Sequence, residues 1–229
     1  MKIIIVFATF KEAEYILKTY NPDYKNNANL INIVESEKIN IDILITGIGI
    51  VNTTYKLTKY ADNYNLILNA GIAGAFNKNI KLGEPVFVKN EILADFGVID
   101  ENSFKTAKEL MFDENQYIEN DSENISQSFE ILKKCTGITV NSVSAKKEII
   151  NNWTKIYNPD IETMEGYAVA YIAKNEKIKS IQIRAISNYI GERNKEKWEV
   201  DLAIQNYSDI IINYVNSLIK DSVANNLNI

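Results

Sequence analysis

The 229-residue sequence contains no histidine, a single cysteine and only three prolines. The absence of histidine removes the commonest general base and the commonest metal ligand, and it excludes every Ser-His or Cys-His nucleophile pair. Acid and base chemistry must therefore use carboxylates, tyrosine or lysine. A lone Cys135 excludes an internal disulfide and a thiolate metal cluster. Because it follows Lys133 and Lys134, we expect it at a helix end in a structural role.

The sequence also lacks a linker, a membrane span and a basic stripe. No proline-, glycine- or serine-rich stretch divides the chain, and 46% of its residues are hydrophobic, which predicts one domain over residues 1–220. Residues 221–229 carry few apolar side chains and are expected to form a poorly ordered tail. The apolar run at residues 3–7 is too short for a membrane span or a signal peptide. With a net charge of −5, we expect a cytoplasmic protein that binds neither nucleic acid nor a membrane.

Short apolar runs alternate with amphipathic segments along the chain, which is typical of an α/β protein with a buried sheet. The apolar runs predict strands at residues 2–8, 41–46, 66–70, 85–93, 137–143 and 180–187. The amphipathic segments predict helices at residues 11–18, 51–63, 122–134, 146–155, 165–176 and 198–219.

Two glycine-rich segments follow predicted strands, at residues 47–49 and 71–74. Glycine lets backbone amides approach a ligand closely, but tight strand-to-helix turns need glycine for purely structural reasons as well. Neither segment matches the dinucleotide fingerprint or the phosphate-binding loop with its lysine. The glycines alone leave both interpretations open.

The order of the polar segments is more specific than any one of them. An N-terminal strand ending near Glu12, the two glycine segments, Met164-Glu165 and residues 183–188 together resemble the purine nucleoside phosphorylase and nucleosidase superfamily, over about residues 1–218. Within it, residues 93–98, 162–166 and 188–198 look most like futalosine hydrolase, which releases hypoxanthine from futalosine in menaquinone biosynthesis. The resemblance implies a three-layer α/β fold with a central mixed sheet, and a homodimer or higher oligomer. It implies no metal or organic cofactor.

The resemblance also implies roles for individual residues. Glu12 matches the carboxylate that orients and deprotonates the attacking water, although by itself it would be a charge at a helix N-terminus. Glu165 matches the carboxylate that binds the ribose 2′ and 3′ hydroxyls, and Met164 the side chain that packs on the sugar and base. Without the resemblance they would be a first-turn carboxylate and a core residue. Gly71 is expected to approach the substrate, and Glu162 is expected to be solvated.

Asn188 bears on which purine leaves. Cleavage of an N-glycosidic bond develops negative charge on the departing base, and relatives that release adenine usually place an aspartate here. An amide cannot be a general acid at neutral pH, but its carbonyl accepts from a protonated N7 while its amino group donates to a 6-oxo oxygen. This favours hypoxanthine or guanine. Ser187 and Arg184 either orient the amide or only pack within the strand. The alternative is that Asn188 only caps the following loop.

The nucleophile is predicted from Asn69. Bacterial phosphorylases with this pattern carry a phosphate-binding arginine two residues before the glycine that matches Gly71, and loss of that cation favours water over phosphate. Three alternatives stay open: a methylthioadenosine or adenosylhomocysteine nucleosidase, a purine nucleoside phosphorylase, and a non-catalytic nucleoside-binding protein. Cationic side chains at 193, 195 and 197 either meet a carboxylate on the substrate or face solvent. No role follows for Asp95 or Phe96.

Overall fold

The computed structural model describes residues 1–25, 28–101, 103–112, 114–121 and 126–224. Its main sheet contains the strands β1 (Lys2–Phe7), β2 (Leu30–Glu35), β3 (Asn40–Ile45), β4 (Leu66–Ala75), β5 (Pro85–Leu93), β8 (Tyr117–Glu119), β9 (Lys133–Thr139), β10 (Ile161–Thr163) and β11 (Lys179–Tyr189). The helices are α1 (Phe10–Tyr20), α2 (Ile50–Thr58), α3 (Gln127–Glu130), α4 (Lys147–Tyr157), α5 (Gly166–Glu176) and α6 (Val200–Ala224). A small hairpin of β6 (Gly97–Ile99) and β7 (Phe104–Thr106) stands apart from the main sheet.

The sheet is mixed, and part of it closes on itself. Its strand order is β10-β9-β5-β11-β4-β1-β3-β2, with β8 paired to β5. Strands β3, β1, β4 and β11 run parallel, whereas β5 is antiparallel to β11 and β10 is antiparallel to β4. Because β10 also pairs with β9, the strands β4, β11, β5, β9 and β10 form a closed ring. Since the carboxyl ends of parallel strands meet at one edge, residues that follow β1, β3, β4 and β11 come together there.

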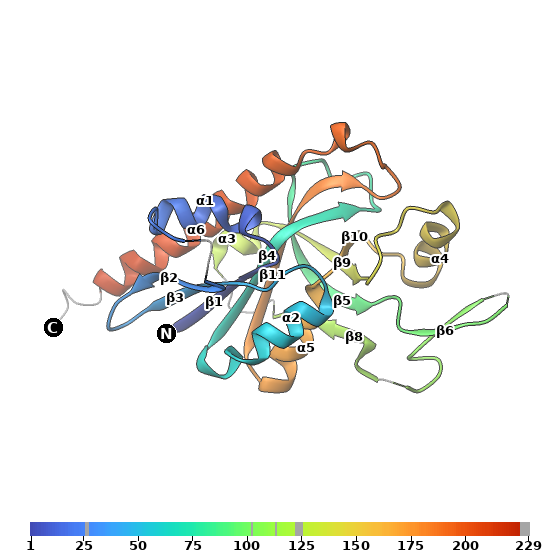
Figure 1. Ribbon diagram of the computed structural model, residues 1–229, viewed down its shortest axis with the longest axis horizontal. Helices are drawn as coiled ribbons and strands as arrows, with labels where there is room; N and C mark the ends of the chain where they lie inside the picture. The colour runs from blue at the N-terminus through green and yellow to red at the C-terminus, as the bar shows by residue number, and fades with distance from the viewer. Residues whose placement is uncertain (26–27, 102, 113, 122–125, 225–229) are drawn as a thin grey trace.

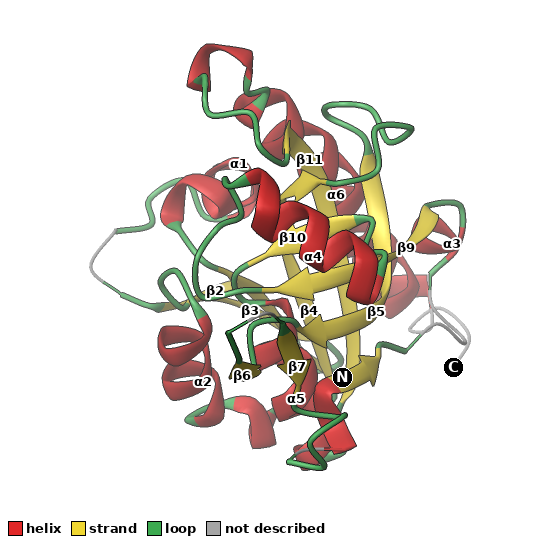
Figure 2. Ribbon diagram, turned by 90° about the vertical axis from the view of Figure 1, so that its right-hand side faces the viewer, coloured by secondary structure: helices red, strands yellow, loops and turns green. Residues whose placement is uncertain are grey.

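Helices cover both faces of the sheet, as Figures 1 and 2 show: α1, α3 and α6 lie on one side and α2 and α5 on the other. Strand β1 serves both layers, because alternate side chains point to opposite faces. Ile5 packs in the cluster beneath α1 and α6, whereas Val6 packs beneath α2 and α5. The predicted three-layer α/β fold with a central mixed sheet is confirmed.

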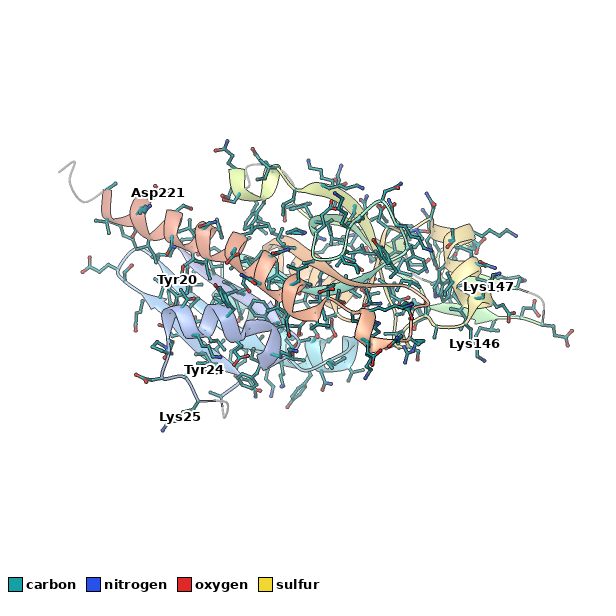
Figure 3. The ribbon with its side chains drawn as sticks, turned by 90° about the horizontal axis from the view of Figure 1, so that it is seen from above. Tyr20, Tyr24, Lys25, Lys146, Lys147 and Asp221 are labelled. Atoms are coloured by element: carbon teal, nitrogen blue, oxygen red, sulfur yellow. The ribbon has the colours of Figure 1, made fainter. Side chains whose placement is uncertain are left out.

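The layer of α1 and α6 is joined by polar as well as apolar contacts. The hydroxyl of Tyr20, labelled in Figure 3, donates to the carbonyl of Ile212 at 3.1 Å and to the side chain of Asn216 at 2.9 Å. The buried hydroxyl of Tyr207 donates to the carbonyl of Glu12 at 2.6 Å. These bonds fix both ends of α1 against α6.

The predicted strands at 2–8, 41–46, 85–93 and 180–187 and the predicted helices at 11–18, 51–63, 146–155, 165–176 and 198–219 correspond to observed elements. Strand β4 is longer than predicted and runs through residues 71–74, so this glycine segment is not a turn. The helix predicted at 122–134 is wrong over 131–134, where the chain leaves the short α3 and enters β9 at Lys133, and residues 122–125 lie outside the described part. Cys135 is therefore in a strand, where it is buried, and not at a helix end. The short strands β2, β6, β7, β8 and β10 were not predicted.

Helix α6 continues to Ala224 and so includes residues 221–224 of the expected tail. Residues 225–229 lie outside the described part of the chain. None of the helices in the described ranges combines the length and apolarity that a bilayer crossing needs.

Candidate active site

A cavity of about 330 Å³ opens where the carboxyl ends of the parallel strands meet. Most of its walls come from four places in the chain: the β1–α1 junction, the distal half of β4, the β10–α5 junction and the end of β11 with the loop that follows. Of the six residues expected to act in catalysis or substrate binding, five line it together, namely Glu12, Met164, Glu165, Ser187 and Asn188. Gly71 is not among the lining residues.

Glu12 occupies the cavity wall and the first turn of α1 at once. Thr9 and Glu12 form a capping box, in which Glu12 Oε2 accepts from the Thr9 amide and hydroxyl, both at 2.9 Å. Oε1 accepts from the amide of Ile72 at 3.3 Å, and the side chain is buried. The helix-terminal and catalytic interpretations of Glu12 are therefore compatible, because the cap holds the carboxylate at the cavity.

Glu165 lies at the junction of β10 and α5, and two groups far away in sequence hold its carboxylate. Oε1 accepts from the amide of Gly49 at 2.9 Å, and Oε2 lies 4.0 Å from Arg184 Nη1. Gly49 caps α2 with a φ of 94°, a conformation that favours glycine. Burial raises the pKa of Glu165, whereas Arg184 and the Gly49 amide oppose that rise. The 47–49 turn thus presents a backbone amide to a side chain of the site.

Gly71 contributes space behind the cavity wall. A Cβ at this position would lie 2.5 Å from Arg184 Nη1 and 2.6 Å from Glu12 Oε1, both too close for a real contact. The buried Arg184 guanidinium fills this space and donates to Asn69 Oδ1 at 3.2 Å. Arg184 thus stands beside the carboxylates of Glu12 and Glu165, and its role in orienting Asn188 stays a prediction.

Asn188 lines the cavity near the end of β11. Its Oδ1 is 2.9 Å from the hydroxyl of Ser187, which also lies 3.3 Å from the carbonyl of Ala73, and its Nδ2 donates to the carbonyl of Tyr189 at 3.2 Å. The register between β4 and β11 shifts between Ile186 and Asn188, which marks an irregularity in the strand at this point. Ser187 therefore orients the Asn188 carbonyl, as expected.

A fully buried carboxylate, Glu91, stands behind the site and was not predicted from the sequence. Its Oε1 accepts from the hydroxyl of Thr139 at 2.7 Å, and its Oε2 from the amide of Gln182 at 3.0 Å. The same Thr139 hydroxyl accepts from the amide of Tyr167 at 2.8 Å, in the first turn of α5. Burial raises the pKa of Glu91 to about 7, against the effects of Thr139, Arg184 and Gln182. This network fixes the end of α5 at which Glu165 lies.

Comparison with known proteins places this geometry in a family. A sequence profile of the Phosphorylase superfamily matches residues 2–220. The chain belongs to the phosphorylase superfamily. It is 30% identical over 168 residues to the futalosine hydrolase of Thermus thermophilus, covering 70% of this chain and 75% of that protein. It is 24% identical over 227 residues to the aminodeoxyfutalosine nucleosidase of Campylobacter jejuni, covering 94% and 96%. A crystal structure of the Helicobacter pylori 5′-methylthioadenosine/S-adenosyl homocysteine nucleosidase has a TM-score of 0.78 at 18% identity, covering 95% of this chain and 98% of that one.

In this phosphorylase-superfamily chain, the end of the cavity near Glu12 carries more negative than positive charge. The carboxylates of Glu12 and Glu165 lie there with the guanidinium of Arg184. The ammonium of Lys11, which also lines the cavity, is paired with Asp201 at 2.9 Å. Asn69, where an arginine would supply a second cation, is buried and is bonded to Arg184. An arrangement of this kind disfavours a dianion and accommodates a neutral nucleophile.

The mouth of the cavity carries the loop after β11. Arg193 and Trp198 line the cavity, whereas Lys195 and Lys197 do not. Lys197 lies 2.9 Å from Glu192 in an exposed ion pair, so it faces solvent, the second of the two alternatives. Asp95 lies outside the cavity lining and accepts from the amide of Asn141 at 2.6 Å, which anchors the segment after β9.

Proposed function

We propose that this chain is a futalosine hydrolase, which cleaves the N-glycosidic bond of futalosine with water and releases hypoxanthine in menaquinone biosynthesis in the cytoplasm. The enzyme is an N-glycosyl hydrolase of the nucleosidase type, in keeping with its family and its curated relatives. The observation that carries the narrower proposal is the amide of Asn188 in the cavity lining, oriented by Ser187.

The proposed reaction divides the cavity into three parts. Glu12 takes a proton from water at the sugar face away from the base, and its negative charge stabilises the positive charge that develops on the ribose. Glu165 accepts hydrogen bonds from the ribose diol, which orients the ring. Met164 lies beside Glu165 in the lining and packs on the sugar and base.

Asn188 reads the base in this proposal. Its Oδ1 is oriented by Ser187 and accepts from the protonated N7 of the leaving purine. Its Nδ2 donates to the carbonyl of Tyr189 at 3.2 Å and has a second hydrogen for the 6-oxo oxygen. A 6-amino group would direct its own hydrogens at that Nδ2, so a 6-oxopurine fits better.

Water rather than phosphate is the proposed nucleophile. The excess of carboxylates near Glu12 would repel phosphate, and Asn69 offers no charge to hold it. A phosphorylase is therefore the weaker alternative. Retention of Glu12 and Glu165 in the same cavity also speaks against a protein that only binds nucleosides.

A second candidate is a nucleosidase that acts on 6-aminopurine nucleosides. It is supported by the likeness to the Campylobacter jejuni aminodeoxyfutalosine nucleosidase, which extends over 94% of this chain at 24% identity. The futalosine hydrolase of Thermus thermophilus is more similar in sequence but over a shorter stretch. Futalosine and aminodeoxyfutalosine differ at the base, and there Asn188 favours the first candidate.

We also propose that the chain forms a homodimer or a higher oligomer, with the neighbouring copy beside the cavity. Three apolar side chains on and just before α2, namely Ile48, Val51 and Tyr55, are 56%, 77% and 62% exposed. Ile48 also lines the cavity, so a second copy that covers this face would close one wall. Sedimentation of the wild type and of Val51→Asp tests this: a wild-type monomer would contradict it.

The deciding experiment is chromatography of the free base after incubation of the protein with futalosine, inosine and methylthioadenosine, each with and without phosphate. Hypoxanthine released from futalosine without phosphate is the expected result. Release that requires phosphate would establish a phosphorylase, and adenine from methylthioadenosine would establish the second candidate. No base from any substrate would indicate a binding protein.

A further inference from the structure

Glu162 and Asn188 flank one glycine. In the register of the sheet, Glu162 of β10 lies opposite Gly74 of β4, and Asn188 of β11 lies opposite the same Gly74 from the other side. Residues paired across strands direct their side chains to the same face. Neighbouring strands are about 4.8 Å apart, so the two side chains leave the sheet roughly 10 Å from each other. All three residues line the cavity.

Gly74 lies between the two polar side chains in the sheet, and the side chain of Ile190 packs over it. A Cβ at this position would lie 2.6 Å from Ile190 Cδ1 and 3.2 Å from Asn188 Nδ2. The cavity lining therefore combines the amide of Asn188, the carboxylate of Glu162 and the apolar side chain of Ile190 packed over Gly74. A flat purine ring with polar atoms at both edges fits a cavity lined in this way.

The carboxylate of Glu162 is only half satisfied. It is not solvated, as the sequence led us to expect, but is 4% exposed. Its Oε1 accepts from the amide of Ser144 at 2.9 Å, while among the described residues Oε2 has no hydrogen-bond partner. The Ser144 hydroxyl is buried beside this carboxylate, and with the Ser144 amide it opposes the rise that burial causes in the pKa of Glu162. An unsatisfied buried polar atom is costly, and at the wall of a cavity it indicates a ligand group that completes it.

We propose that Glu162 is a second base-reading residue, whose free oxygen accepts a hydrogen bond from N1–H of a 6-oxopurine. The inference rests on the proposed function, because it requires a 6-oxopurine substrate. Asn188 then reads N7 and O6, and Glu162 reads the N1 edge. In adenine N1 carries a lone pair and no hydrogen, so the carboxylate would repel it. The last side-chain torsion of glutamate, χ3, has a broad distribution of angles. A rotation about χ3 brings the buried Oε2 to the base.

The purely structural alternative is that Glu162 only holds the segment around Ser144. That segment leads into α4, where Figure 3 labels Lys146 and Lys147. A structural role predicts that removal of the charge weakens every ligand alike. Base reading predicts a change that depends on the hydrogen at N1, and this difference separates the two.

The test measures inhibition constants of hypoxanthine, 1-methylhypoxanthine and adenine for the wild type, Glu162→Gln and Ser144→Ala. The wild type should bind hypoxanthine on the order of tenfold to a hundredfold more tightly than the other two bases, the effect of leaving one buried polar group unpaired. Glu162→Gln places an amino group near N1, so the preference over adenine should fall at least about tenfold. The preference over 1-methylhypoxanthine should shrink as well. Ser144→Ala keeps the carboxylate and should retain both preferences.

Equal preferences for hypoxanthine over the other two bases in the wild type and in Glu162→Gln would overturn the assignment. The N1 methyl group of 1-methylhypoxanthine would then weaken binding only through its bulk. Should Glu162→Gln not fold, Glu162→Asp withdraws the oxygens by one methylene and should reduce the same preferences. The proposed function fails separately: a wild type that releases adenine and no hypoxanthine would contradict the 6-oxopurine substrate. A wild type that releases hypoxanthine, with preferences insensitive to Glu162, would contradict this inference alone.

Discussion

The guanidinium of Arg184 lies 4.0 Å from the carboxylate of Glu165, and both side chains are buried. The same guanidinium approaches Glu12 over Gly71, where one added carbon would touch both residues. One cation thus stands between the proposed water-activating carboxylate and the proposed ribose-binding carboxylate. It lowers their mutual repulsion in a place where burial alone would favour protonation.

Replacement of Glu12 by glutamine should lower the chemical rate at least about a hundredfold, the usual scale for loss of a general base. The amide keeps an acceptor for the Thr9 amide, so substrate binding should persist. Thr9→Ala is the matched control, because it weakens the capping box by about 1 kcal/mol and keeps the carboxylate. Single-turnover kinetics and thermal melts distinguish the two effects, and near-normal turnover of Glu12→Gln would refute the role.

Glu165→Gln should weaken recognition of the ribose. A neutral amide accepts hydrogen bonds from a diol less strongly than a carboxylate, although it can still accept from the Gly49 amide. We expect the variant to lose more activity on a ribonucleoside than on its 2′-deoxy analogue, which already lacks one hydroxyl. Values of kcat/KM for this pair of substrates provide the measurement. Unchanged discrimination between them would mean that Glu165 does not bind the sugar hydroxyls.

Asn188→Asp should move the preference from hypoxanthine toward adenine. A carboxyl group that carries a proton can give it to N7, and an ionised one accepts from a 6-amino group, whereas it opposes a 6-oxo oxygen. The ratio of kcat/KM for a 6-oxo and a 6-amino nucleoside should fall by about tenfold or more, the scale of one good base contact. Ser187→Ala, which leaves the amide in place, should reduce both activities while changing the ratio less. An unchanged ratio of the two kcat/KM values in Asn188→Asp would contradict the proposal that Asn188 reads the base.

Gly71→Ala should lower kcat by displacing residues behind the cavity wall. The new methyl group would force Arg184 or Glu12 to move, and a displacement of about 1 Å can cost a hundredfold in rate. We expect a loss of kcat with retained secondary structure, checked by circular dichroism alongside the assay. Near-normal kcat would show that the tight packing over Gly71 is not needed for catalysis.

The sequence predicted what local patterns determine. Apolar β1, β5 and β11 and the amphipathic helices α1, α5 and α6 follow from periodicity, and they bring Glu12 and Asn188 to the same edge of the sheet. Periodicity does not predict which strands pair when they are far apart in the sequence. Strand β10 has only three residues, and its pairing with β4 places Glu162 opposite Gly74.

The contacts of polar side chains inside the sheet also could not be predicted from the sequence. Glu91 lies in an apolar strand, and no local signal shows that Thr139 and Gln182 from two neighbouring strands will satisfy it. A glutamate within an otherwise apolar run is itself a signal that could have been weighed. The contact of Gly49 with Glu165, which are 116 positions apart, has no counterpart in the local sequence.

The pH dependence of stability should report on Glu91. Its pKa is raised from 4.5 to about 7 by burial, with Arg184 and Glu165 as the neighbouring charges. Below pH 4.5 the carboxyl is protonated in both states and imposes no penalty. Between pH 4.5 and 7 the unfolded chain releases the proton while the folded chain keeps it, so stability falls as pH rises, by about 3 kcal/mol in all.

Glu91→Gln should remove that part of the pH dependence. The introduced amide can donate to Gln182 Oε1, which is buried without a partner among the described residues, once the Gln182 amide turns over. Urea unfolding at pH 5, 6, 7 and 8 should therefore give a flatter curve for the variant than for the wild type. Glu119→Gln, the same change on an exposed carboxylate paired with Lys89, controls for the substitution itself. Parallel curves for the wild type and Glu91→Gln would show that Glu91 does not titrate in this range.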